Sequence, residues 1–223
     1  MPVFTRLAPR RALHLSALLL IAGCVAPREV TQEVTHEVTA ETVAEVEPAP
    51  ISLDGWPAET FALPPGFAPE LPTGSESLLF SPGWRDPTAE GFWSYAFVMS
   101  IDEPAPDAAR VDELLELYYS GLMEAFARGD LVATIGDSVS VDVVQHAPNH
   151  FEAEMHLIDA FATLEPIALR VLVDTVAVSD ERSSVSIRVS AQPKEHEIWR
   201  SLEAAIASIR LAGDTGVHAA EQD

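Results

Sequence analysis

The strongest constraint on the fold is a two-residue period in the second half of the chain. Apolar side chains occupy the odd-numbered positions of four successive stretches, residues 139–143, 151–157, 167–173 and 185–189. Because side chains of a strand point alternately to opposite faces, each stretch predicts a β-strand with one apolar face. Short turn sequences at residues 148–149 and 179–182 separate neighbouring stretches. Short turns favour antiparallel pairing, which brings all the odd-numbered side chains to one face of a sheet.

The first half of the chain adds two strands and a helix to this pattern. Residues 76–81 are a short apolar run closed by Pro-Gly, and residues 92–101 alternate large apolar side chains with smaller ones. Both stretches predict strands. Asp107 then precedes a run with helical spacing, and its carboxylate is suited to cap the first turn. We expect this helix to run for about 20 residues and to end at Gly129.

A second helix is expected near the end of the chain. It should begin at Pro193 or Lys194 and end at about Leu211, with Gly213 as its stop. The predicted element order is therefore ββαββββα. The expected fold class is α+β, a mainly antiparallel sheet of about six strands with two helices packed on its apolar face.

The beginning of the chain has the features of an export signal. Three arginines and no acidic residue precede an apolar run over residues 12–22, and the only cysteine of the 223 residues, Cys24, follows it. That run is shorter than the roughly 20 apolar residues needed to cross a bilayer. A basic start and a short apolar core that ends in small residues are typical of a signal peptide. The sequence Leu20-Ile21-Ala22-Gly23-Cys24 resembles the lipobox of bacterial lipoprotein precursors.

This resemblance implies that residues 1–23 are removed by cleavage between Gly23 and Cys24. It also implies that diacylglycerol is attached to the thiol of Cys24 and that fatty acids such as palmitate anchor the chain. Each buried methylene contributes about 0.8 kcal/mol, so two or more acyl chains bind firmly. We expect a protein anchored in the bacterial cell envelope that faces the periplasm or the exterior. Val25 favours the outer membrane by the enterobacterial sorting rule. An ordinary secretory leader and an uncleaved signal anchor are the alternatives.

Residues 24–50 are expected to be the lipidated cysteine and an acidic tether. The unit Glu-Val-Thr recurs from Glu29, without any aromatic residue, leucine or isoleucine up to residue 47. Valine alone offers too little apolar area to offset the entropy of ordering, so the repeat predicts a flexible segment. A partner-binding repeat is the alternative.

Loss of the three leader arginines changes the formal charge from −22 to −25. Such an acidic chain is unsuited to nucleic acid and to anionic membrane surfaces.

Residues 51–212 are expected to form a single domain, followed by a flexible tail over residues 213–223. Residues 51–74 mix large apolar side chains with prolines, which predicts an extended segment across the domain surface. Proline-rich recognition by a partner is the alternative. The element order and the sequence Phe61-Ala62-Leu63-Pro64-Pro65-Gly66-Phe67 resemble the PsbP/Mog1-like class of α/β sandwiches. That resemblance implies accessory or binding work rather than catalysis.

One short motif points to catalysis. The sequence Ile135-Gly136-Asp137-Ser138 resembles the nucleophile block of GDSL/SGNH hydrolases, which implies that Ser138 is a nucleophile. A serine hydroxyl needs a base and an orienting carboxylate to act in this way. The Gly-x-Asn-Asp block of that family is absent, and no Asp-x-x-His stands near the C-terminus. The structural interpretation is a Gly-Asp turn into the following strand.

Three histidines form the other candidate site. His146, His150 and His156 lie near several carboxylates, and imidazole and carboxylate groups suit zinc. The alternative is a solvated ladder of charges on the outer face of the sheet, where Asp174 and Arg188 can pair across strands. The even-numbered residues expected on that face are Glu152, Glu154, His156, Arg170, Asp174 and Arg188.

Taken together, these features predict a lipid-anchored, non-catalytic binding or accessory domain. No cofactor and no nucleic acid are expected, and the expected partners are the membrane, through the lipid, and an envelope protein or small ligand. A GDSL-like hydrolase that uses Ser138 and a purely structural envelope protein are the alternatives.

Overall fold

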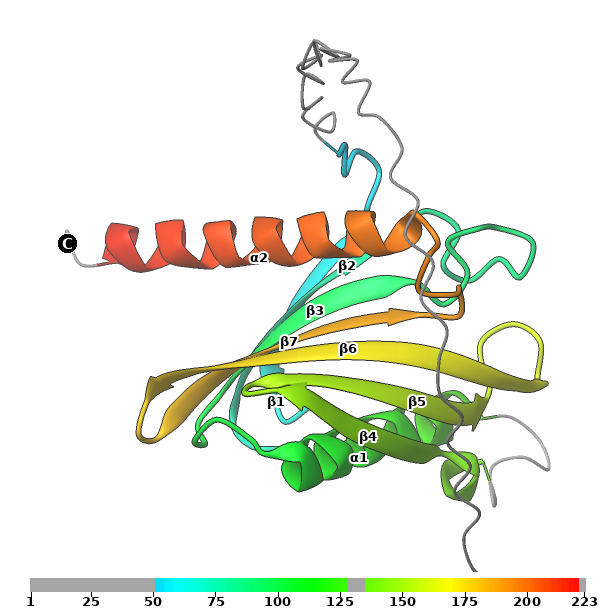
Figure 1. Cartoon of the computed structure of the whole chain (residues 1–223), viewed down its shortest axis with the longest axis horizontal. Helices are drawn as coiled ribbons and strands as arrows, with labels where there is room; N and C mark the ends of the chain where they lie inside the picture. Colours follow the sequence, from blue (N-terminus) through cyan, green and yellow to red (C-terminus); the bar gives the residue numbers. More distant parts are fainter. Residues whose placement is uncertain (1–50, 128–134, 221–223) are drawn as a thin grey trace, which may run out of the picture. The chain divides into compact units, whose positions relative to one another are not determined.

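Seven antiparallel strands form one sheet in the computed structural model, which describes residues 51–127 and 135–220 (Figure 1). The strands follow the order β1-β2-β3-β7-β6-β5-β4 across the sheet. They are β1 Ala58–Leu63, β2 Gly74–Phe80, β3 Tyr95–Ile101, β4 Ser140–Ala147, β5 His150–Ile158, β6 Pro166–Ser179 and β7 Arg182–Ser190. With its two helices, the sheet confirms the predicted α+β class, and it has one strand more than the six or so expected.

Strands β4 to β7 are the four stretches predicted from the two-residue period. Met155, Val171 and Ile187, at odd positions of three different strands, are at most 2% exposed. The β4–β5 connection turns at Asn149, whose φ is 63°. Asparagine tolerates this left-handed conformation better than most residues, which explains its place in the turn. The predicted antiparallel register with one apolar face is thus confirmed.

Strand β1 was not predicted, because the segment that contains it is rich in proline. Pro57 and Pro64 flank the strand rather than interrupt it. The strand pairs only with β2 and lies at the edge of the sheet, where a neighbouring proline removes no essential ladder bond. The residues between these prolines thus extend the sheet instead of crossing its surface.

Strand β3 begins at Tyr95, three residues later than the alternation indicated. The backbone N–H of Ser94 bonds Gly91 O at 2.9 Å, and Trp93 has a left-handed φ of 49°. A turn therefore occupies the start of the predicted strand. Trp93 is nevertheless 1% exposed, as expected for a core residue.

Helix α1, Ala108–Phe126, begins where the sequence indicated. The side chain of Asp107 accepts a hydrogen bond from Arg110 N at 3.0 Å and caps the first turn. The helix ends three residues before Gly129, which lies outside the described residues. It packs on the apolar face of the sheet and buries six side chains there, Val111, Leu114, Leu115, Tyr118, Tyr119 and Met123.

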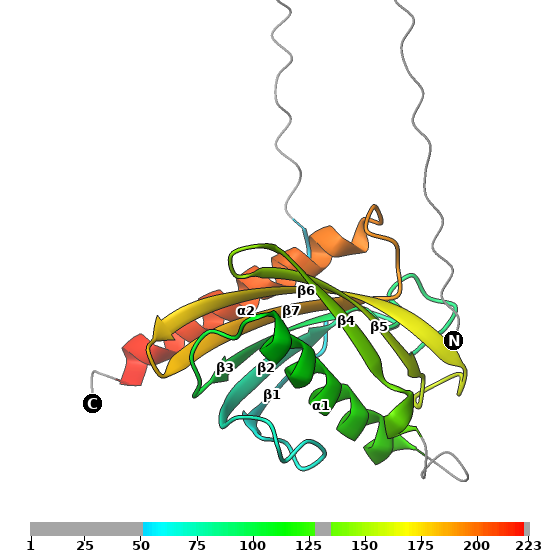
Figure 2. The ribbon, with the colours of Figure 1, turned by 60° about the horizontal axis from the view of Figure 1, so that its bottom comes forward.

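Helix α2, Ile198–Ala220, lies on the opposite side of the sheet from α1 (Figure 2). The prediction that both helices cover the same face is wrong. Leu202, Ala205 and Ile206 of α2 pack against small and aliphatic side chains of the other face, including Ala96 and Leu172. Ala96 and Leu172 are even-numbered, so this second face of the sheet is partly apolar rather than wholly polar. Helix α2 covers the apolar part of this face over β2, β3 and β7.

The ends of α2 also differ from those predicted. A turn occupies the residues before Ile198, with His196 N bonded to Pro193 O at 3.0 Å. At the other end the helix continues through Gly213 to Ala220. Gly213 and Gly216 each cost the helix about 1 kcal/mol, which weakens this end of the helix but does not end it. In the described parts of the chain, no helix combines the length and the apolar character needed to cross a membrane.

Candidate functional site

Charged and histidine side chains gather on the face of β5 and β6 that points away from α1. Strand register places them together, since His150 pairs with Asp174 and Glu154 with Arg170. We call this surface the charged face. Its members are Glu152, Glu154, His156, Arg170, Asp174 and Arg188, with His146, His150, Lys194 and Glu203 bonded to them.

Arg188 is the centre of the charged face. Its guanidinium bonds Asp174 of β6 and Glu203 of α2, and only 5% of the residue is exposed. His150 Nδ1 lies 2.7 Å from the other carboxylate oxygen of Asp174. Burial raises the pKa of Asp174, but the hydrogen bond with His150 and the charge of Arg188 outweigh it and hold the pKa below its ordinary value. The predicted Asp174–Arg188 pair is confirmed, and together with His150 and Glu203 it joins β5, β6, β7 and α2.

A second group of the charged face surrounds Glu152. Lys194 binds its carboxylate, and His146 Nε2 lies 3.1 Å from the same oxygen. The bond from Lys194 and the neighbouring charges lower the pKa of Glu152. The carboxylate is therefore ionised at neutral pH and paired with a surface lysine.

The three histidines are held apart by their own carboxylate partners. His146 faces Glu152, His150 faces Asp174, and His156 Nε2 lies 3.0 Å from Glu154. Over residues 51–127 and 135–220, no group of three or more His, Cys, Asp or Glu side chains is placed to hold a metal ion. Each histidine contacts one carboxylate of the sheet's outer face, which is the ladder that the alternative interpretation of the sequence describes.

Ser138 lies at the end of a short 3-10 turn, η2 Gly136–Ser138, just before β4. Its hydroxyl donates to Ile135 O at 2.6 Å and accepts from Ile158 N at 3.4 Å. These two backbone contacts fix the turn into the strand, as the structural interpretation of the motif requires. The hydroxyl proton is directed to a carbonyl oxygen and not to a histidine.

Ser138 and His156 nevertheless line the same depression, of about 410 Å³. The remaining lining residues belong to β5 and β6, namely Leu157, Ile158, Pro166, Ile167 and Ala168. His156 is paired with Glu154, so a serine, a histidine and a carboxylate lie near the start of β4 and the end of β5. Within the described part of the chain, this depression brings together Ser138 and His156, one residue from each candidate site.

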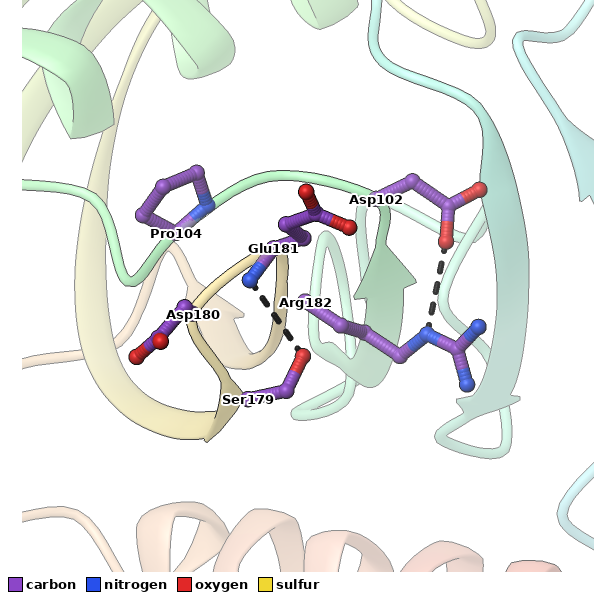
Figure 3. Close-up of a pocket in the computed structure, with 6 residues that line it drawn as sticks. All are labelled: Asp102, Pro104, Ser179, Asp180, Glu181 and Arg182. Carbon is purple, nitrogen blue, oxygen red and sulfur yellow. Dashed lines mark hydrogen bonds and ion pairs between the residues drawn. The ribbon is translucent and has the colours of Figure 1, made fainter.

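A larger depression, of about 650 Å³, lies at the tip of the β6–β7 hairpin (Figure 3). Arg182 Nε bonds Asp102 Oδ1 at 3.4 Å across it, and Glu181 N bonds Ser179 Oγ at 3.3 Å. The arginine and the aspartate are each at least half exposed. Water competes for exposed charges of this kind, so they form a weak surface pair.

One ionisable group stands out that no sequence motif marks. Glu76 is fully buried in β2, where Tyr118 of α1 donates a hydrogen bond to its Oε1 at 2.9 Å. Burial raises the pKa of Glu76 to about 8, against the opposing effect of the Tyr118 bond. The only signal in the sequence is the position of Glu76 in its strand. It is even-numbered like Leu78 and Phe80, whose side chains are buried in the core, so its side chain points to the same face.

The remaining predicted site residues, Gly23 and Cys24, lie outside the described residues, as do the signal peptide and the tether. No protein-family model, no curated protein and no solved structure matches this chain.

Proposed function

We propose that the chain is the precursor of a lipid-anchored envelope lipoprotein whose α+β domain is a non-catalytic binding or accessory module. The observation that carries the proposal is the sequence Leu20-Ile21-Ala22-Gly23-Cys24 after a basic start and a short apolar run. The lipid on Cys24 holds the mature chain in the envelope, with the outer membrane as the favoured location. The acidic tether then separates the domain from the bilayer surface.

The charged face supports a binding role for the domain. Its more exposed members carry both signs of charge and are held by their neighbours, because Lys194 binds Glu152 and the buried Arg188 fixes Asp174 and Glu203. Fixed charges of both signs select a partner by complementary charge more than they add affinity. The partner is an envelope protein or a small ligand with charges of both signs.

The lipid anchor is tested by Cys24→Ser in the full-length chain. We expect the variant to incorporate no labelled fatty acid and either to stay unprocessed or to leave the membrane fraction, because serine offers no thiol for lipid attachment. Fractionation and metabolic labelling measure both effects. Val25→Ala is the matched control and should remain lipidated. Normal cleavage and unchanged membrane retention of Cys24→Ser would contradict the anchor.

A serine hydrolase is the second candidate, since Ser138 and His156 line one depression and His156 is paired with Glu154. The base would have to take the proton that Ser138 donates to Ile135 O, which requires rotation of the hydroxyl. Binding remains the better supported function because that hydroxyl already has two backbone contacts.

Esterase measurements separate these two functions. We expect no hydrolysis of short-chain esters that depends on Ser138, so purified wild type and Ser138→Ala should give the same background rate. Ser140→Ala, two residues further on, is the control for nonspecific effects. Turnover that disappears in Ser138→Ala and persists in Ser140→Ala would establish the hydrolase instead.

A further inference from the structure

The buried carboxyl of Glu76 links the sheet to helix α1. Glu76 pairs with Met99 in β3 and points into the core, where Tyr118 OH donates to its Oε1 at 2.9 Å. Its Oε2 is buried as well and has no hydrogen-bond partner among the described residues. A carboxyl group with one oxygen unpaired in an apolar core is stable only when neutral, because an ionised one loses its hydration without compensation.

No positive charge among the described groups that act on Glu76 offsets its ionisation. The groups are Tyr118 and Tyr119 of α1, Tyr95 of β3 and Glu59 of β1. Tyr95 and Tyr119 bond each other through their hydroxyls at 2.6 Å. Burial raises the pKa values of all three tyrosines, so these groups stay neutral, while Glu59 adds repulsion.

The chain between β1 and β2 closes over this cluster. The ring of Phe67 packs edge-on against Tyr118, with ring centroids 5.3 Å apart. Its backbone lies so close to α1 that only glycine fits at position 121, where a Cβ would stand 2.0 Å from Phe67 O. Water therefore reaches the carboxyl only when this segment or α1 moves.

We propose that Glu76 and Tyr118 form a pH-dependent switch that holds α1 on the sheet while the carboxyl is protonated and releases it when the carboxyl ionises. Ionisation places a charge beside Tyr95 and Tyr118 in a sealed core, and movement of α1 is the way to hydrate it. The switch is a property of the domain and does not depend on the proposed lipid anchor.

The direction of the pH effect follows from proton linkage. The folded domain keeps the Glu76 proton up to about pH 8, whereas an opened or unfolded chain loses it near the ordinary pKa of 4.5. The contribution of Glu76 to stability is therefore largest below that ordinary value and is lost as pH rises to about 8. One proton released on unfolding increases the unfolding equilibrium constant about tenfold per pH unit within this interval.

The test is urea unfolding of the full chain between pH 5.5 and pH 8.5, with native-state hydrogen exchange corrected for intrinsic rates. In wild type we expect the unfolding constant to rise by up to about tenfold per unit, and α1 amides to lose protection before those of β5 and β6. Glu76→Gln should remove most of this dependence. Glu116→Gln, an exposed position on α1, is the matched control and should retain it.

A second measurement does not rely on the variant folding. Carbon-13 NMR of the glutamate carboxyl groups in wild type should show one that titrates near pH 8, far above the acidic range of a free glutamate. If every glutamate titrates in that acidic range, or if Glu76→Gln unfolds with the same pH slope as wild type, the switch is wrong. The same holds if α1 and the central strands lose protection together.

Discussion

Asp174→Ala is expected to destabilise the domain by about 2–4 kcal/mol, because it removes the less exposed of the two carboxylates that bind the charge of Arg188. Arg188 is 5% exposed, and after the substitution the carboxylate that it keeps among the described residues is Glu203, whose side chain is 63% exposed. Removal of one member of a buried ion pair is costly since the other charge stays desolvated. Urea unfolding near pH 7 measures the difference in free energy of unfolding.

Two further variants test whether the loss of stability comes from the unpaired charge of Arg188 or from the loss of any carboxylate on this face. Glu154→Ala removes an exposed partner of His156, and exposed pairs contribute at most about 1 kcal/mol. Arg188→Met combined with Asp174→Leu removes both charges, and we expect this double variant to recover most of the stability. Equal losses for Asp174→Ala and Glu154→Ala would mean that Arg188 finds other compensation.

Local patterns in the sequence were sufficient for most of the fold. The odd-numbered apolar positions of β4 to β7 predict both the strands and their common face, because each depends only on the two-residue period. Asp107 predicts the start of α1, since a cap is a contact within one turn. Strand β1 and the side of the sheet covered by α2 depend on contacts between distant segments, which no local pattern records.

The same distinction holds for the candidate site. Asp174 and Arg188 are both even-numbered, which places them on one face of the sheet and was enough to predict their pairing. This numbering does not show that Glu203 of α2, 15 residues further along, is a second partner of Arg188, or that Arg188 is nearly buried. The burial of Glu76 was equally hidden, because it depends on Tyr118, 42 residues away in α1. Ionisable groups acquire unusual properties through burial, and burial is decided by tertiary packing.

Gly121→Ala is expected to destabilise the domain by about 2–3 kcal/mol, the reverse of the usual effect in a helix. Alanine is normally better than glycine by about 1 kcal/mol at an interior helical position. Here the new Cβ would lie 2.0 Å from Phe67 O and 2.9 Å from Phe67 C, so backbone must move. Overpacking against a fixed neighbour typically costs about 1–3 kcal/mol.

Ser120→Ala is the matched control on the same turn of α1, and we expect it to change the free energy of unfolding by less than about 0.5 kcal/mol. If Gly121→Ala is instead more stable than wild type, the segment around Phe67 yields freely and cannot seal the core.

A destabilised Gly121→Ala has a second expected consequence. Displacing Phe67 removes its ring from Tyr118 and admits water towards Glu76, so the pKa of that carboxyl should fall towards its ordinary value. The glycine would then act on the titration of a residue that it does not touch, through the packing of one aromatic ring.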